Sequence, residues 1–288
     1  MIVRRVALVT CDEYPQLTAD DRLLLPALTA HAMTPEIVVW NDPNIDWRVF
    51  DGVVIRSTWD YYRRADEFRN WLSLIASNDV LLLNPVATVQ GNMDKTYLRE
   101  LAARGISTVP TAWIEPAHRD QVLAQLRAVP WDAELVIKPS VSAGAFRTVR
   151  TSKEALLRDP APLFEILTES VALVQPFLPE IEQDGEWSFL FFGGIFSHAV
   201  IKRPKSGDFR VQWVHGGGHS LAQTSADVQA ATIARQVAGD GLLYARVDGV
   251  VRDGTFLLLE IELIEPFLFL AEDPLAADRF VKALRVLL

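Results

Sequence analysis

The stretch LLLEIELIEP, residues 257–266, places three acidic side chains in a segment that otherwise has the composition of a buried strand. Successive side chains of a strand point to opposite faces, so Glu260 and Glu262 share one face and are neighbours. Two carboxylates in a poorly hydrated site repel each other unless a cation compensates them. The pair therefore indicates a cation-binding strand.

The preceding apolar stretch, LLYARVDGVV, supplies a third carboxylate, Asp248, and is followed by the turn sequence RDG. A three-residue hairpin turn, with its glycine in the left-handed conformation, pairs Val251 with Thr255. In that register Asp248 shares a face with Glu260 and Glu262 and lies diagonally to Glu260. A two-residue turn would move Asp248 to the opposite face, so the prediction depends on the turn type.

Three carboxylates on one face of a hairpin suit Mg²⁺, which prefers oxygen ligands and keeps positions open for water and phosphates. An exposed edge hairpin with solvated acids is an alternative, but the flanking LLL and FLFL favour burial. A hydrolase that uses Glu260 and Glu262 is another, although adjacent positions on one face are too crowded for that role. We therefore predict a metal site at Asp248, Glu260 and Glu262.

Four cationic side chains could neutralise phosphate beside such a metal. Lys138 ends the apolar strand ELVIKP and precedes SVSAGA, whose small residues allow the backbone to approach phosphate closely. Lys95 begins a helix in NMDKTYL, and Lys202 and Arg210 lie in IKRPKSGDFRVQ. No Walker A sequence occurs in the chain. Each residue alone could be a solvated cation, so the inference rests on their order relative to the acids.

The first part of the chain has the rhythm of a βαβ unit. Its apolar strands are predicted at 2–10, 37–40 and 51–55, and an amphipathic segment at 20–32. The polar run RSTWDYYRR follows the third strand at its carboxyl end, where open parallel sheets place ligand sites. A capping role in the loop explains this run nearly as well as substrate binding does. The predicted substrate-binding residues are Arg56, Ser57, Thr58, Asp60 and Tyr61.

The pattern changes twice further along the chain. A helix in 92–105 opens an α+β segment, and from Glu186 onward successive strands dominate, one of them at 209–214. A helix at about 225–239, the acidic hairpin and a terminal helix follow. We therefore predict an α/β (α+β) protein of three domains. Their predicted boundaries are 1–92, 93–178 and 179–288.

The composition favours chemistry on small molecules. The chain has 288 residues and a net charge of -9, from 28 basic and 37 acidic residues. This balance disfavours nonspecific nucleic-acid binding, which depends on basic surface. No bilayer-spanning apolar run and no signal-peptide pattern is present, so we expect a cytoplasmic protein that does not bind membranes. The single Cys11 excludes an internal disulfide and is interpreted as a packing residue.

The order of the motifs resembles that of the ATP-grasp ligases across essentially the whole chain. The chain has the family's motifs in the family's order: the two lysine motifs, a linker strand VQPFL, a basic strand pair, an RxD strand and an ExE strand. The resemblance implies an N-terminal pre-ATP-grasp domain, a central lid domain and a C-terminal antiparallel-sheet domain. GDFRVQWVHGGG is similar to the glutathione-synthetase and RimK-like branch. The combination of RSTWDY, NMDKTYL, VIKPSVSAGA and GDFRVQ is similar to the O-ureido-serine cyclo-ligase subgroup of cycloserine biosynthesis.

The resemblance also implies a role for each motif. Adenine would lie on the linker, ribose on a glutamate, and phosphates on the lysines. Two magnesium ions, or Mn²⁺ in their place, would be held by the three acids, although many members carry Asn at the position of Glu262. The implied nucleotide-binding residues are Lys95, Lys138, Gln175, Pro176, Phe177, Leu178, Glu182 and Glu186. The implied catalytic residues are Lys202, Arg210 and Arg246.

The implied reaction joins a carboxylate to an amine through an acyl phosphate, with ATP and a small amino-acid-like substrate as partners. Its specific form would be the cyclisation of O-ureido-serine to cycloserine. A RimK-like or glutathione-synthetase-like ligase remains an alternative, as does a nucleotide-binding protein without turnover. The presence of both lysines and all three acids disfavours the last of these. Homodimers are common in this family.

The glycine-rich segment HGGGHS spaces His215 and His219 like a zinc pair. The intervening glycines disfavour a helix, and no third ligand is nearby, so a zinc site is not expected. Glycines instead permit close backbone approach in a loop that covers a substrate. Gly217 is the predicted substrate-binding residue of this loop.

Overall fold

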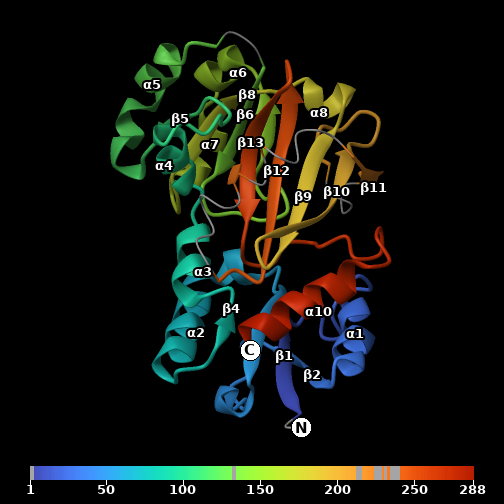
Figure 1. Ribbon diagram of the computed structural model, residues 1–288. Coiled ribbons are helices and arrows are strands. Elements are labelled where there is room, and N and C mark those ends of the chain that lie inside the picture. Colours follow the sequence, from blue (N-terminus) through green and yellow to red (C-terminus); the bar gives the residue numbers. More distant parts are fainter. Residues whose placement is uncertain (1–2, 132–133, 212–215, 224–228, 230–231, 234–240) are drawn as a thin grey trace.

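A computed structural model describes residues 3–131, 134–211, 216–223, 229, 232–233 and 241–288 (Figure 1). Three sheets, one from each successive part of the chain, organise these residues. One sheet is parallel and two are antiparallel, which confirms the predicted α/β (α+β) class. None of the helices in the described part has the length and apolar character needed to cross a membrane.

The N-terminal sheet is parallel and buried on both faces. Its strands, in spatial order, are β2 (Met33–Val39), β1 (Arg4–Thr10), β3 (Gly52–Ser57) and β4 (Leu82–Leu83). The surrounding helices are η1 (Asp21–Leu23), α1 (Leu24–Ala30), η2 (Trp47–Val49), η3 (Tyr61–Arg64), α2 (Ala65–Ser77) and α10 (Ala276–Leu287). Val6 and Leu8 of β1 face a core shared with α1 and α10, whereas Ala7 and Val9 face a core shared with α2. The C-terminal helix therefore completes the N-terminal unit, as Figure 1 shows.

The middle of the chain forms a small antiparallel sheet with helices around it. Its strands, in spatial order, are β5 (Ala112–Ile114), β8 (Ala172–Pro176), β6 (Leu135–Pro139) and β7 (Val149–Thr151). The helices around it are η4 (Pro116–Gln121), α5 (Val122–Ala128), α6 (Lys153–Arg158) and α7 (Ala161–Ile166). Before this sheet in the sequence, α3 (Val86–Asn92) packs in the N-terminal core beside α2, and α4 (Tyr97–Ala103) packs in the core of the third sheet. Along β6, Leu135 and Ile137 enter the core, so the alternation turns Val136 and Lys138 toward a cavity.

The C-terminal sheet carries the predicted metal site. Its antiparallel strands, in spatial order, are β11 (Gly218–Ala222), β10 (Ile195–Arg203), β9 (Glu186–Phe192), β12 (Tyr244–Arg252) and β13 (Thr255–Glu262), and α8 (Glu180–Gln183) precedes β9. Phe189, Val247 and Ile261 enter one core from this sheet. The alternate side chains, including Arg246 and Glu262, line the cavity from the other face.

The turn between β12 and β13 differs from the predicted one. Arg252 pairs with Thr255, which leaves only Asp253 and Gly254 in the turn. Both have a positive φ, 52° and 73°, as a type I′ turn requires. The prediction of a three-residue turn is therefore wrong, because the Asp-Gly pair forms the two-residue turn that matches strand twist.

A β-bulge nevertheless keeps the three acids on one face. The pairing of Gly249 with Leu258 is followed by that of Asp248 with Glu260, so Leu259 has no partner in the ladder. This extra residue shifts the register by one and reverses the effect of the shorter turn. The predicted shared face is confirmed, although the ladder reaches it by a different route.

Three further elements differ from the prediction or lie outside the described residues. Helix α2 was not among the predicted elements, although Phe68, Trp71, Leu72 and Ile75 give it one apolar face. The described residues of the strand predicted at 209–214 are not in a strand, and β11 begins only at Gly218. The rest of that segment and most of the helix predicted at about 225–239 lie outside the described residues.

Asn84, after β4, connects the N-terminal unit to the acidic hairpin. Its amide nitrogen donates to the carbonyls of Tyr244 and Leu263, both at 2.8 Å, and its amide oxygen accepts from Leu243 N, also at 2.8 Å. The side chain is fully buried, so these bonds form away from water. They fix the start of β12 and the residue after β13, and thereby the strands that carry the acids.

Candidate active site

A cavity of about 650 Å³ lies where the three parts of the chain meet. Lys138 and Gln175 line it from the central sheet, Lys202 and Arg246 from the C-terminal sheet, and Tyr61 from the N-terminal unit. Its volume is in the range of cofactor and small-molecule sites. Residues far apart in sequence therefore converge on one space that could hold a nucleotide and a small substrate.

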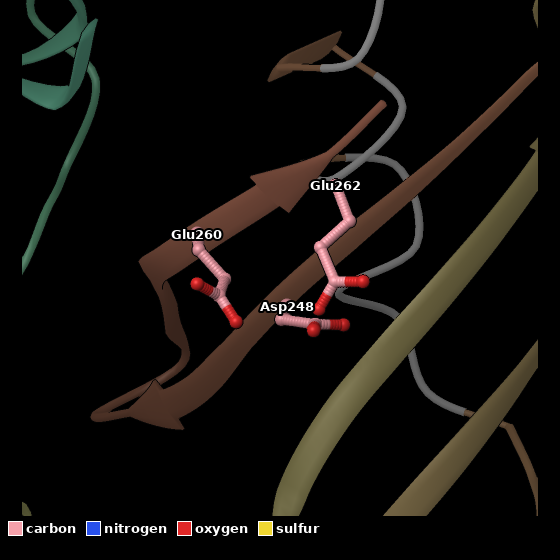
Figure 2. Close-up of side chains that lie close together, drawn as sticks. All are labelled: Asp248, Glu260 and Glu262. Carbon is pink, nitrogen blue, oxygen red and sulfur yellow. The ribbon is translucent and has the colours of Figure 1, made fainter. Parts of the chain in front are cut away.

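Three carboxylates converge beside this cavity. Asp248, Glu260 and Glu262 each offer an oxygen, and these oxygens lie within 4.8 Å of one another (Figure 2). Asp248 is fully buried beneath the pair, whereas Glu260 and Glu262 line the cavity. The donor set consists of hard oxygen ligands, so the residues present fit Mg²⁺ or Mn²⁺.

Arg246 compensates two of these acids. Its guanidinium donates to Asp248, at 2.8 Å from one nitrogen, and to Glu262. Burial raises the pKa of Asp248, but Arg246 and Lys202 outweigh burial and hold that pKa at about 2. Asp248 is therefore ionised at neutral pH.

The two glutamates of the cluster have opposite pKa shifts. Burial raises the pKa of Glu262 to about 7, against the opposing charge of Arg246. Burial also acts on Glu260, but Lys95 and Lys138 together lower the pKa of that carboxyl. Lys95 Nζ lies 3.5 Å from Glu260 Oε2. The pKa values of the two glutamates therefore shift in opposite directions, because Lys95 and Lys138 outweigh burial at Glu260 whereas burial outweighs Arg246 at Glu262.

Lys202 belongs to the same network from the far side. Its ammonium lies 2.5 Å from Glu186 Oε1 and 3.3 Å from Asp248 Oδ2. Burial opposes the charged form of Lys202, but Asp248 and Glu186 outweigh it and raise the pKa of the lysine. Burial raises the pKa of Glu186. Arg246 and Lys202 therefore place two fixed positive charges at this end of the cavity.

The motifs that contain Lys95 and Lys138 meet at the loop after β6. Lys95 Nζ donates to the carbonyl of Ser142 at 2.6 Å, and Gly144 and Phe146 of the same loop line the cavity. Lys138 also lines it, and no described residue forms an ion pair with its ammonium. Burial lowers the pKa of Lys138. An anionic ligand would therefore relieve an uncompensated charge at this position.

The linker predicted to bind adenine lies along the cavity, with Gln175, Pro176, Phe177 and Leu178 all in its lining. The two glutamates predicted to bind ribose lie in different environments.

Glu186 lines the cavity but pairs with Lys202, whereas Glu182 is outside the lining and lies 2.5 Å from Arg150 Nη1. Arg210 lines the cavity and pairs with Asp208 of its own loop at 2.8 Å. Gly217 is outside the lining. The structure therefore brings Glu186 and Arg210 to the cavity, but not Glu182 or Gly217.

The polar run that begins at the end of β3 splits into buried and cavity-lining residues. Arg56 is fully buried and donates to Asp21 at 2.9 Å and to the carbonyl of Pro266 at 2.6 Å. Ser57 donates to Asp21, and Asp60 accepts from the indole of Trp40. The predicted substrate-binding residues outside the lining are Arg56, Ser57, Thr58 and Asp60. Of the five predicted, only Tyr61 lines the cavity.

Other cavity residues had no predicted role in the site. Trp59 and Glu265 line it, and the Trp59 indole donates to the carbonyl of Glu265 at 3.0 Å. Burial, with the charge of Glu262, raises the pKa of Glu265 well above its usual range. The spacing of EIELIE was the available signal for Glu265. Of the two histidines with zinc-like spacing, His219 has its Nε2 3.3 Å from Glu272 Oε1, and His215 is outside the described residues.

Comparisons with known proteins agree with this arrangement. Residues 6–84 match the family model described as "D-cycloserine synthetase DcsG, N-terminal domain". The cycloserine biosynthesis protein DcsG of Streptomyces lavendulae is 32% identical over 302 residues, which cover 97% of each chain. A crystal structure of D-cycloserine synthetase DcsG is similar with a TM-score of 0.84 and 30% identity, covering 97% of this chain and 98% of that one.

More distant structures share the fold. D-alanine–D-alanine ligase from Bacillus anthracis has a TM-score of 0.68 at 15% identity, covering 99% of this chain and 98% of that chain. A RimK domain ATP-grasp protein from Sphaerobacter thermophilus has the same TM-score at 17% identity, covering 97% and 98%. The predicted ATP-grasp fold is therefore confirmed. With the identity and coverage shared with the Streptomyces protein, this chain belongs to the DcsG family of ATP-grasp ligases.

Proposed function

We propose that this protein is an ATP-dependent carboxylate–amine ligase of cycloserine biosynthesis that activates its substrate as an acyl phosphate. One observation carries the chemistry. Glu260 and Glu262, members of a three-carboxylate cluster, line the same cavity as Lys95 and Lys138. Metal-binding acids that face lysines are the pairing that phosphoryl transfer requires, because both neutralise charge on the transferred group.

In this proposal the nucleotide lies between the central and C-terminal sheets. The linker from Gln175 to Leu178 would hold adenine, and Lys95 and Lys138 would face the phosphates. Lys138 supports this orientation because its ammonium is buried without an ion pair to any described residue. A phosphate would supply the missing negative charge.

Mg²⁺, or Mn²⁺ in its place, would be held by Asp248, Glu260 and Glu262, with two ions expected. A bound metal would supply charge neutralisation for the phosphoryl group. The same carboxylates contact Arg246, Lys202 and Lys95 in the structure. Metal binding would therefore compete with these cations for the carboxylate oxygens.

The proposed ligation has two steps. The substrate carboxylate attacks the γ-phosphorus of ATP in line, the bond to the bridging oxygen of ADP breaks, and an acyl phosphate forms. Arg246 and Lys202, which line the cavity, would hold the carboxylate and the transferred phosphoryl group. A nitrogen then attacks the acyl carbon, loses a proton and expels phosphate. With O-ureido-serine as substrate that nitrogen belongs to the same molecule, and its attack closes the ring. Hydrolysis of the urea C–N bond by water then releases the carbamoyl group as carbon dioxide and ammonia and leaves cycloserine.

ADP release by the purified protein tests the proposal. We expect release that requires both Mg²⁺ and O-ureido-serine, that stops when EDTA is added, and that accompanies a cyclic product detected by mass spectrometry. An intermolecular product from amino acids or dipeptides would instead identify a RimK-like ligase. ATP binding without turnover across O-ureido-serine, amino acids and dipeptides would overturn the proposed activity.

A further inference from the structure

The carboxylate of Glu265 has no partner within the described part of the protein. The residue is 7% exposed and lines the cavity, yet its carboxylate forms no hydrogen bond or ion pair there. Burying a carboxylate is costly unless donors or a cation compensate it. An unpartnered carboxylate that faces a cavity therefore indicates a ligand that carries positive charge or hydrogen-bond donors.

The protein's own cations near Glu265 are engaged elsewhere. Lys95 contacts Glu260 and the carbonyl of Ser142. Arg246 contacts Asp248 and Glu262, and Arg56 contacts Asp21 and the carbonyl of Pro266. Each of these cations is in direct contact with another acceptor. The negative charge of Glu265 is therefore available to pair with a bound ligand.

The surroundings of Glu265 suit an organic cation better than a metal ion. Trp59 donates to the backbone of Glu265, and Tyr14 and Phe267 pack against Trp59 with ring centroids 5.0 and 6.2 Å away. These three rings and Tyr61 all line the cavity. Aromatic faces attract ammonium groups, whereas Mg²⁺ requires a shell of oxygen ligands.

The metal cluster itself also excludes Glu265. Among the described residues, only Asp248, Glu260 and Glu262 form a group whose ligand oxygens all lie within 4.8 Å of one another. Glu265 follows Glu262 by three residues and lies outside that group. Its carboxylate is thus near the site of phosphoryl transfer without belonging to the metal site.

We propose that Glu265, with the rings of Trp59 and Tyr61, binds the α-ammonium group of the substrate. The inference rests on the proposed function and names the residue that selects its substrate class. An α-amino acid carries its ammonium one carbon away from its carboxylate. Glu265 holds the ammonium end while the carboxylate end lies at the site of phosphoryl transfer, and carboxylic acids without an amino group lack the interaction with Glu265.

Calorimetric binding of two compounds, in the presence of ADP and Mg²⁺, tests this assignment without turnover. The compounds are O-ureido-serine and its analogue with hydrogen in place of the amino group. We expect the wild type to bind the amino acid roughly 10- to 100-fold more tightly, the range for a hydrogen bond between charged groups. Glu265→Gln should remove this preference by weakening only the amino acid, and Glu265→Asp should keep part of it.

Glu13→Gln is the matched control. Glu13 is an exposed acid that also lines the cavity and pairs with Arg63, so this variant should keep the preference. Equal wild-type affinity for the two compounds, including no binding of either, overturns the assignment. So does a Glu265→Gln variant that keeps the preference or loses both compounds equally.

The proposed function is judged separately, by ADP release from the wild type with O-ureido-serine. A wild type that prefers the amino acid in binding but releases no ADP would overturn the ligase activity alone. Release of ADP by a wild type that binds both compounds equally would overturn only the role of Glu265.

Discussion

Asp248 lies directly opposite Glu260 in the β12–β13 ladder because Leu259 is left out of the pairing. This pairing places a fully buried carboxylate beneath one that lines the cavity. The cluster is therefore a property of the bulged hairpin as a whole, and its function depends on both strands.

Replacing Glu260 with Gln should abolish metal-dependent turnover while leaving the fold intact. The amide removes a charged ligand and the partner of Lys95, so we expect kcat to fall by at least about 100-fold, the scale of losing one electrostatic stabiliser. ADP release measured against Mg²⁺ concentration checks the effect. Glu100→Gln, on the exposed surface of α4, is the control and should keep full activity. Normal turnover of the Glu260 variant would remove the metal assignment.

Two glycines of the same hairpin should differ in their tolerance of alanine. A Cβ on Gly249 would lie 2.4 Å from both the Leu257 carbonyl oxygen and the Phe256 ring, so Gly249→Ala should destabilise the protein by roughly 3 kcal/mol. Gly254 has open space around it and a positive φ, so Gly254→Ala should cost only about 1 kcal/mol. Urea unfolding measures both variants. Equal losses would contradict the close packing at the bulge.

Lys138→Met should separate stability from ATP affinity. The ammonium is desolvated without an ion pair to a described residue, so the nucleotide-free variant should be at least as stable as the wild type. Loss of a charged contact to phosphate should raise the Kd for ATP about 10-fold or more. Thermal unfolding with and without ATP measures both effects. Lys282→Met, at an exposed ion pair with Asp278, should change neither.

His198 should make stability depend on pH. Burial lowers the pKa of this histidine, whose Nε2 lies 3.1 Å from the Leu268 carbonyl and therefore donates to it. The unfolded state then binds the proton more readily, so stability falls as pH drops below the ordinary pKa of about 6.5. The slope from one such group is at most about 1.4 kcal/mol per pH unit. In urea unfolding from pH 7.5 to 5.5, His198→Gln should lose less stability than the wild type; parallel pH profiles would contradict this role.

Local patterns were sufficient for the acidic strand but not for its turn. Strict alternation places Glu260 and Glu262 on one face whatever the partner strand does. The position of Asp248 depends on the bulge, which involves the packing of Gly249 against Phe256, a contact between strands that one-strand periodicity does not contain. The shared face was predicted correctly because two departures from the expected ladder cancelled.

The polar segment that begins with the last residues of β3 shows a second limit of sequence reasoning. Its place at the carboxyl end of a parallel strand follows from topology, and Tyr61 does reach the cavity. Arg56 instead turns inward, because Asp21 and the carbonyl of Pro266, at two distant points of the chain, accept its hydrogen bonds. Glu265 was visible as the last acid of EIELIE, but its lack of a partner appears only once its neighbours are in place.

Packing of α10 on the N-terminal sheet also constrains how the protein can be made. Phe280, Val281 and Leu284 share a core with Val6 and Leu8, so β1 is covered by a helix that is synthesised long after it. Until that helix has left the ribosome, one side of the nascent sheet lacks its apolar lining and is exposed to misassembly. Loss of α10 by truncation would therefore damage a sheet that was synthesised much earlier.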